Sequence, residues 1–292
     1  MSTYRIPFSL LPYFSLTEDQ RDHRCKDAFP VKSILQLLEE KKRSYFYDSF
    51  TALNLPPNGS NENRMALALK AARRKDHSLY LIYNSLPDSY GHKYGPISPE
   101  LENAVREMDD QLESFVNIYK KEVGDATFIF LGDHGMLPVI KLFDAKKVLF
   151  DLSKESGLKL KKDFIYFLDS TLLRVWFFSE RAKRLLPVAL KKSDKFNQYG
   201  KFIDERMAQR FHVPWGDRRY GDIIWWADNG VLIYPDFFHN SEMAYRGMHG
   251  YDPELVECQG TCIVYGPNIT SRTIDVLPLK SVFDILKRLL EI

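Results

Sequence analysis

The sequence predicts an α/β protein with a mainly parallel central sheet and helices on both of its faces. Short, continuously apolar segments recur, such as residues 78–86 and 126–131, and amphipathic helical segments separate them. Strands that are apolar throughout are typical of parallel sheets buried on both faces. The pattern changes between about residues 137 and 245, which indicates an inserted α+β sub-lobe.

The elements expected before the sub-lobe follow from apolar spacing and from turn residues. Residues 1–30 are extended, aromatic and interrupted by prolines, and residues 53–61 form a loop rich in proline, asparagine and glycine. The best helix is 99–121, where apolar residues recur every three or four positions behind Pro99. We expect helices at 31–42, 62–74 and 99–121, and strands at 43–50, 78–86 and 126–131.

The sub-lobe is expected to contain strands at 164–170 and 172–178, a helix near 179–191, and then charged, loop-rich sequence. Residues 223–235 are typical of a β-hairpin that turns at Asp228-Asn229-Gly230. The chain then returns to the core with a strand at 261–266 and a terminal amphipathic helix at 281–292. The predicted core is therefore 1–136 with 246–292, and the predicted sub-lobe is 137–245.

Composition excludes several classes of protein. The 292 residues are 45% hydrophobic and 27% charged with a net charge of +2, which gives no signal for nucleic acid or an anionic membrane. No apolar stretch approaches the roughly 20 residues that span a bilayer. Three cysteines, Cys25, Cys258 and Cys262, do not form a disulfide framework. We expect a cytoplasmic protein.

Three polar clusters follow or interrupt apolar segments. Asp88 and His92 lie in PDSYGHKYGP, Asp133 and His134 lie in LGDHGM, and His249 lies between two glycines in GMHGYDPE. Carboxylate oxygens and imidazole nitrogens are ligands that suit zinc and other first-row metals. In open α/β sheets, ligands bind beyond the carboxyl ends of strands, where the first two clusters are expected.

Each cluster also has an ordinary interpretation. Asp88 after Pro87 is typical of a turn, Asp133 after Gly132 of a strand exit, and His249 of an exposed loop. Asp133 and His134 would face opposite sides of a regular strand, so they share a metal only where the strand has ended and Gly135 bends the chain. The three clusters together favour a metal site. The remaining histidines are interpreted as structural or surface residues: His23, His77, His212 and His239.

These motifs resemble those of the type I phosphodiesterase and nucleotide pyrophosphatase family of the alkaline phosphatase superfamily. The matching segments are PDxxGHxxGP at 87–96, VREMDDQL at 105–112, DHGM at 133–136 and MHGYDP at 248–253. Their order and separations match as well, and the resemblance covers roughly residues 30–290. Each motif alone is weak, whereas the ordered set is specific.

The resemblance implies an alkaline-phosphatase-like sheet with up to two zinc ions at its strand ends, other divalent metals being alternatives. It implies that Asp88, His92 and His249 bind one ion and that Asp133 and His134 bind the second. In the family the ions polarise a phosphoryl group and stabilise the attacking and leaving oxygens. A threonine or serine attacks phosphorus, and activated water hydrolyses the covalent intermediate.

The sequence departs from the family before Pro87. Neither the strand ending in Asp-Gly, whose Asp also binds the second metal, nor the nucleophile segment is found there, and Thr3, Thr17 and Thr51 lack the expected context. No catalytic nucleophile is therefore identified. Three explanations stay open: an artefact in where the sequence starts, a natural loss, or a strand supplied by another chain.

The leading hypothesis is a zinc-dependent hydrolase of phosphodiester or nucleotide pyrophosphate bonds, or a truncated form of one that is weakly active or inactive as this chain. The alternatives are a non-catalytic, metal-dependent binder of a phosphorylated ligand and a sulfatase or phosphomutase relative. The expected partner is a small phosphorylated substrate, with nucleotides among the candidates. Substrate choice is assigned to the sub-lobe, although its aromatic residues also suit a small core: Trp215, Tyr220, Trp225 and Trp226.

Overall fold

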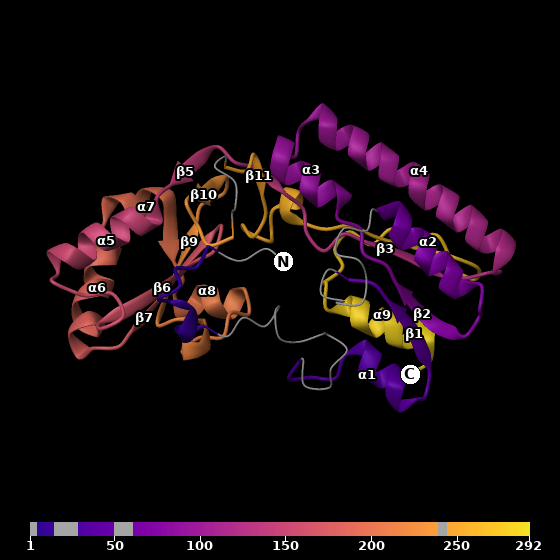
Figure 1. The fold of residues 1–292 in the computed structure, drawn as a ribbon, viewed down its shortest axis with the longest axis horizontal. Coiled ribbons are helices and arrows are strands. Elements are labelled where there is room, and N and C mark those ends of the chain that lie inside the picture. Colours follow the sequence, from indigo (N-terminus) through magenta and orange to yellow (C-terminus); the bar gives the residue numbers. More distant parts are fainter. Residues whose placement is uncertain (1–4, 15–28, 50–60, 239–243) are drawn as a thin grey trace. The chain divides into compact units, whose positions relative to one another are not determined.

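The structure is a computed structural model that describes residues 5–14, 29–49, 61–238 and 244–292 (Figure 1). The chain folds into two compact units. The first unit comprises residues 1–14, 91–98 and 134–259, and the second comprises 15–90, 99–133 and 260–292. Within the described ranges, no helix combines the length and apolar character that a bilayer crossing needs.

The second unit is an α/β arrangement. Its strands are β1 (Ser44–Tyr47), β2 (His77–Leu81), β3 (Phe128–Leu131) and β12 (Cys262–Tyr265). β1 and β2 run parallel, whereas β12 pairs antiparallel with β3. Its helices are α1 (Ile34–Glu40), α2 (Asn61–Ala72), α4 (Pro99–Glu122) and α9 (Ser281–Leu290). In Figure 1, α4 and α9 lie on opposite sides of these strands.

Apolar side chains of α2 and α4 form the core on one face of this unit. Met65 and Leu69 of α2 pack with Phe115 of α4, and Phe46 of β1 and Phe128 of β3 lie against them. Burying each large apolar side chain stabilises the fold by about 1.5–3 kcal/mol. The helical spacing of residues 99–121 predicts this face, and α4 confirms it.

Local side-chain bonds fix where the helices of the second unit begin. Ser33 and Gln36 form a reciprocal capping box at the start of α1: the Gln36 N–H donates to Ser33 Oγ at 3.2 Å, and the Ser33 N–H donates to Gln36 Oε1 at 3.0 Å. Such caps satisfy two of the backbone N–H groups that a helix N-terminus leaves without a partner. The structure thus begins α1 inside the predicted segment 31–42.

A four-stranded antiparallel sheet organises the first unit. Its order is β6 (Phe164–Leu168), β7 (Leu172–Phe177), β9 (Ile223–Ala227) and β8 (Gly200–Phe202). Alternate residues of β7 are buried, as the two-residue period of a strand requires. The Trp225 side chain is fully buried, and its Nε1–H donates to the Phe196 carbonyl oxygen at 3.0 Å.

Helices and short strands surround this sheet. The helices are α5 (Ala145–Glu155), α6 (Glu180–Lys192), α7 (Asp194–Tyr199) and α8 (Glu205–Arg210). β5 (Lys141–Phe143) runs parallel to β10 (Val231–Ile233), and β4 (Leu137–Pro138) pairs antiparallel with β11 (Gly247–Met248). The short 3₁₀ turns are Leu11–Tyr13, Arg218–Tyr220 and Val256–Cys258.

The prediction of a hairpin at 223–235 is wrong, because its two strands do not pair with each other. The turn forms, because the Val231 N–H donates to the Asp228 carbonyl oxygen at 2.9 Å and Gly230 has a φ of 79°. The two strands nevertheless separate: β9 pairs with β7 and β8, whereas β10 pairs with β5. Local sequence sets the turn, while distant segments provide the partners of both strands.

Two further differences concern local structure. The segment containing Asp88 and His92 was expected to be a turn, but it forms helix α3 (Leu86–Tyr94). The supposedly loop-rich sequence after residue 191 contains α7, β8 and α8, which are too short to show a clear period. All but the last residue of the loop predicted at 53–61 lies outside the described residues.

Candidate metal centre

Helix α3 carries the first predicted motif. The Asn84 side-chain oxygen accepts the Leu86 N–H at 2.9 Å, and the Ser89 N–H donates to the Ser85 carbonyl oxygen at 3.0 Å, so the helix has a well-defined start. Pro87 is tolerated in the first turn, where its missing N–H costs no hydrogen bond. Residues four apart share one side of a helix, so α3 places Asp88 and His92 on the same face.

Three of the residues predicted to bind metal, His92, His134 and His249, lie close together in the first unit. The ring centroids of His134 and His249 are 3.8 Å apart, and those of His92 and His249 are 5.0 Å apart. Ligand nitrogens of His134 and His249 lie within 4.8 Å of each other. These residues come from α3, from the segment after β3 and from the segment after β11, so the fold unites three motifs that are distant in sequence.

Backbone carbonyls orient two of these rings. His92 Nδ1 lies 2.9 Å from the Gly247 carbonyl oxygen, and His134 Nδ1 lies 2.9 Å from the Gly135 carbonyl oxygen. A carbonyl oxygen only accepts, so each Nδ1 carries the proton and the lone pair of the neutral ring is on Nε2. Histidines that bind metals typically donate their other ring N–H in this way.

Glycines allow the backbone to close around the histidines. A Cβ at Gly247 would overlap the Gly91 carbonyl oxygen and would lie 2.6 Å from Met136 Sδ. A Cβ at Gly135 would lie 2.9 Å from the Gln259 carbonyl oxygen, and the Gly135 N–H donates to the Cys258 carbonyl oxygen at 2.9 Å. Gly135 and Gly247 therefore serve close backbone approach, which a side chain of any size would prevent.

The two predicted carboxylates belong to the second unit. β3 ends at Leu131, so Asp133 lies beyond the strand, as sharing a metal with His134 would require. Both Asp88 and Asp133 act electrostatically on the Tyr83 phenol, and after burial they are the next causes that raise its pKa. Their common effect on one hydroxyl places a concentration of negative charge around Tyr83.

Sequence reasoning missed one charged residue nearby. Asp48, directly after β1, is almost fully buried and forms an ion pair with Arg64 of α2. Asp48 Oδ2 also accepts the Tyr83 N–H at 3.4 Å, and the Arg64 guanidinium lies 5.6 Å from the centre of the Tyr83 ring. Burial raises the pKa of the Asp48 carboxyl, although Arg64 acts in the opposite direction. A single polar residue at a strand end gave no sequence signal for this pair.

Other predicted residues lie apart from the histidines or outside the described ranges. The rejected nucleophile candidates Thr3, Thr17 and Thr51 lie outside the described residues, as do His23, His239 and Cys25. His77 packs edge-on against Tyr80, with the ring centroids 5.6 Å apart. Cys258 and Cys262 are half-buried free thiols.

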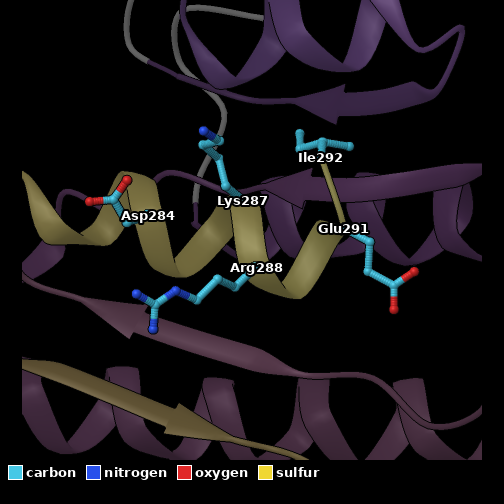
Figure 2. Close-up of a pocket in the computed structure, with 5 residues that line it drawn as sticks. All are labelled: Asp284, Lys287, Arg288, Glu291 and Ile292. Atoms are coloured by element: carbon cyan, nitrogen blue, oxygen red, sulfur yellow. The ribbon is translucent and has the colours of Figure 1, made fainter.

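Two cavities have different characters. One, of about 410 Å³, follows α9, and Figure 2 shows that its charged side chains diverge from the helix rather than converge. The other, of about 330 Å³, lies in the first unit and is mostly apolar. Its lining includes Gly250, the neighbour of His249. We call it the Trp226 pocket, and its walls are formed by residues of β7, β9, the segment 211–220 and the segment after His249.

The chain belongs to the type I phosphodiesterase / nucleotide pyrophosphatase family, whose model matches residues 13–252. An uncharacterized pyrophosphatase/phosphodiesterase of Schizosaccharomyces pombe is 27% identical over 187 residues, which are 60% of this chain and 36% of that protein. The matched segments span between 24% and 36% of the length of three curated relatives.

Solved structures confirm the alkaline-phosphatase-like α/β fold. Human ectonucleotide pyrophosphatase / phosphodiesterase 5 matches with a TM-score of 0.70 and 20% identity over 87% of this chain and 69% of that one. An inactive variant of the murine protein in complex with AMP matches with a TM-score of 0.65 and 21% identity, over 81% and 61% of the two chains. Alkaline phosphatase PafA of Elizabethkingia meningoseptica matches with a TM-score of 0.57 and 15% identity, over 80% and 50%.

Proposed function

We propose that this chain binds zinc and hydrolyses phosphodiester or nucleotide pyrophosphate bonds. The observation that supports this most directly is the convergence of His92, His134 and His249 in one unit. Their ring spacing and their Nδ1 hydrogen bonds suit imidazoles that bind metal through Nε2. Family membership supplies the reaction class.

The ligand assignment follows the family pattern. Asp88, His92 and His249 bind one ion, and Asp133 and His134 bind the other. Two carboxylates and three neutral imidazoles form a donor set that zinc favours. Bound metal would polarise the phosphoryl group and stabilise charge on its oxygens. The protein's own contribution is to hold the imidazoles in one tautomer and orientation through the Gly247 and Gly135 carbonyls.

The substrate is a small phosphorylated molecule, and nucleotides are the first candidates. The murine relative in complex with AMP supports this choice. The sub-lobe at 137–245 is proposed to select the substrate, because its residues form most of the wall of the Trp226 pocket, which Gly250 beside His249 also lines.

Metal content tests the proposed site. Purified protein equilibrated with zinc and then desalted should retain the metal, as measured by plasma emission. His249→Ala should lower zinc affinity by at least about tenfold, since it removes a ligand. His212→Ala is the matched control, because His212 lies in the same unit but is not a proposed ligand. Wild-type protein that retains no zinc would exclude the site.

Turnover distinguishes an enzyme from a metal-dependent binder. The substrate is bis-p-nitrophenyl phosphate, and the expected result is hydrolysis that EDTA abolishes and zinc restores. His249→Ala should lose this activity, whereas His77→Ala should keep it, because His77 is not a proposed ligand and does not line the Trp226 pocket. Zinc binding without turnover by this chain would assign it to the non-catalytic class of phosphoryl binders instead.

A further inference from the structure

Three exposed aromatic side chains lie on one area of the first unit. Phe8 is 91% exposed, Tyr13 is 44% exposed and Phe178 is 43% exposed. The Tyr13 and Phe178 rings stack with their centroids 5.7 Å apart. Two consecutive turns keep Phe8 close to Tyr13: the Leu10 N–H donates to the Pro7 carbonyl oxygen at 2.7 Å, and the Tyr13 N–H donates to the Leu10 carbonyl oxygen at 3.0 Å. We call Phe8, Tyr13 and Phe178 the aromatic patch.

Buried residues of the same segment hold these rings in place. Leu10 is fully buried, and Ile6 is 6% exposed. The Phe14 ring packs edge-to-face against Phe167 of β6 and Trp176 of β7, with centroid distances of 5.2 and 5.6 Å. The segment 5–14 therefore presents its exposed rings from a packed backbone, so a surface that covers them has little ordering entropy to overcome.

Basic residues border the aromatic patch at Phe178. The Phe178 N–H donates to the Asp163 carbonyl oxygen at 2.7 Å, which brings this part of the chain beside Phe178. Asp163 directly follows Lys161 and Lys162, which are both exposed. Arg181 is also exposed, and it acts electrostatically on the Asp163 carboxylate together with Lys162. Three cations therefore lie close to the exposed rings.

Positive charge exceeds negative charge in this area. The segments 161–163, 177–183 and 217–222 together contain six basic and four acidic residues. Three of the acidic residues have a close basic partner within these segments, and the ion pairs are Glu180 with Lys183, Asp217 with Arg219, and Asp222 with Arg218. The excess charge therefore resides at Lys161, Lys162 and Arg181, where Asp163 offsets only part of it.

The aromatic patch projects into solvent. Phe8 lies on an exposed turn, and neither of the two cavities described above has a residue of the aromatic patch in its lining. A protein partner would need a hollow that matches the projecting rings, whereas the headgroup region of a bilayer deforms around them. Aromatic rings favour that region, and acidic headgroups attract lysine and arginine. The net charge of +2 averages over the whole chain and does not reveal this local arrangement.

We propose that the aromatic patch docks the first unit on the surface of an anionic lipid bilayer. Phe8, Tyr13 and Phe178 lie at the level of the headgroups, and Lys161, Lys162 and Arg181 contact acidic headgroups. The association is peripheral, in the manner of amphipathic surfaces that lie on a membrane without crossing it. It is independent of the proposed metal site and hydrolase activity.

Co-sedimentation with lipid vesicles tests the docking. The vesicles contain phosphatidylcholine alone or phosphatidylcholine mixed with phosphatidylserine. Phe8→Ser removes the most exposed ring, and it has a matched control in Trp215→Ser, because Trp215 is a 53% exposed aromatic residue of the same unit outside the aromatic patch. Lys161→Gln/Lys162→Gln removes two cations, and its control is Lys191→Gln/Lys192→Gln at the exposed end of α6. Circular dichroism confirms that each variant is folded.

Wild-type protein should sediment with the phosphatidylserine vesicles and much less with phosphatidylcholine alone, and added salt should weaken the association because it screens the lysines. Phe8→Ser should weaken binding by about tenfold, since one large apolar side chain no longer leaves water. Lys161→Gln/Lys162→Gln should weaken it by about tenfold or more, as the loss of two cations near an acidic surface requires. Both control variants should bind like wild type, and EDTA should change nothing.

Several outcomes overturn the proposal. Absence of sedimentation with phosphatidylserine vesicles does so, as does binding that Phe8→Ser and Lys161→Gln/Lys162→Gln leave intact. Equal binding to both kinds of vesicle contradicts the role of acidic headgroups. Light scattering of the protein without lipid tests the competing occupant: a dimer that Phe8→Ser dissociates, in protein that does not bind vesicles, assigns the aromatic patch to a second copy of this chain.

Discussion

Asp48 and Arg64 form a largely buried charge pair whose contribution to stability depends on pH. Burial raises the pKa of Asp48, and Arg64 lowers it. A carboxyl with a raised folded-state pKa stabilises the fold most below its unfolded pKa, and it loses that stability as pH rises through the folded-state value. Removing Arg64 should therefore increase the loss of folding stability at neutral pH.

We expect Arg64→Met to lower the free energy of unfolding by about 3 kcal/mol at pH 7, because it leaves a buried carboxylate without its counter-charge. The deficit should shrink as pH falls through the raised pKa of Asp48, because the carboxyl then becomes neutral. Urea unfolding at several pH values measures it against wild type. The double variant Asp48→Asn/Arg64→Met should show no such dependence, and a pH-independent deficit in the single variant would contradict the argument.

At Gly247, close contacts with neighbouring atoms leave no room for a side chain. Gly247→Ala would place a Cβ 2.6 Å from Met136 Sδ and closer still to the Gly91 carbonyl oxygen. We expect the variant to be about 1–3 kcal/mol less stable to urea, as overpacking usually costs. Gly132→Ala is the control, since its nearest atom would be the Thr261 nitrogen at 3.4 Å. Equal stability of the two variants would mean that the backbone around Gly247 adjusts.

Helix α4 illustrates how one face of an element supports a whole unit. Phe115→Ala should cost about 3–5 kcal/mol, because it removes a ring from the cluster shared with α2 and the strands. Val105→Ala, on the same helix, should change stability by less than about 1 kcal/mol, since Val105 is 42% exposed. Chemical denaturation of both variants compares them directly. Similar losses of stability in the two variants would show that Val105 is packed as well.

Elements with a clear apolar pattern could be predicted from the sequence. The helices α1, α2, α4 and α9 and the strands β1, β2, β3 and β12 lie within one or two residues of, or inside, their predicted segments. Helix α3 was mistaken for a turn because Pro87 and Gly91 are usual turn residues, yet proline is harmless in a first helical turn. The pairing of β10 with β5 depends on contacts that no local pattern contains.

The candidate site likewise contains some features that the sequence identifies and others that only the folded structure reveals. Glycine-flanked histidines and aspartates identified Asp88, His92, Asp133, His134 and His249 from sequence, and their assignment as ligands stays a prediction. Asp48 and the Trp226 pocket could not be found in this way. The burial of Asp48 depends on Arg64 from a different element, and the pocket combines β7, β9 and the segment after His249. Both are products of tertiary packing.

At the scale of the whole molecule, the proposed metal ligands are distributed over segments that the fold must bring together. His92, His134 and His249 are separated in sequence by α4, β3 and the entire sub-lobe. Ligands of this kind are preorganised only in the folded chain, so metal binding adds directly to folding free energy. Zinc should therefore stabilise the native protein as well as serve its chemistry.

At a free zinc concentration of about 100 times Kd, the added stability should be about 2.7 kcal/mol. For a chain of this size that raises Tm by about 5 °C. The increment should be present at pH 7.5 and should shrink at pH 5.5, because protons compete with zinc for the imidazole nitrogens. Thermal unfolding with zinc and with EDTA at both pH values measures it. His249→Ala should lose the increment and His212→Ala should keep it; an increment that His249→Ala retains would place the zinc elsewhere in the protein.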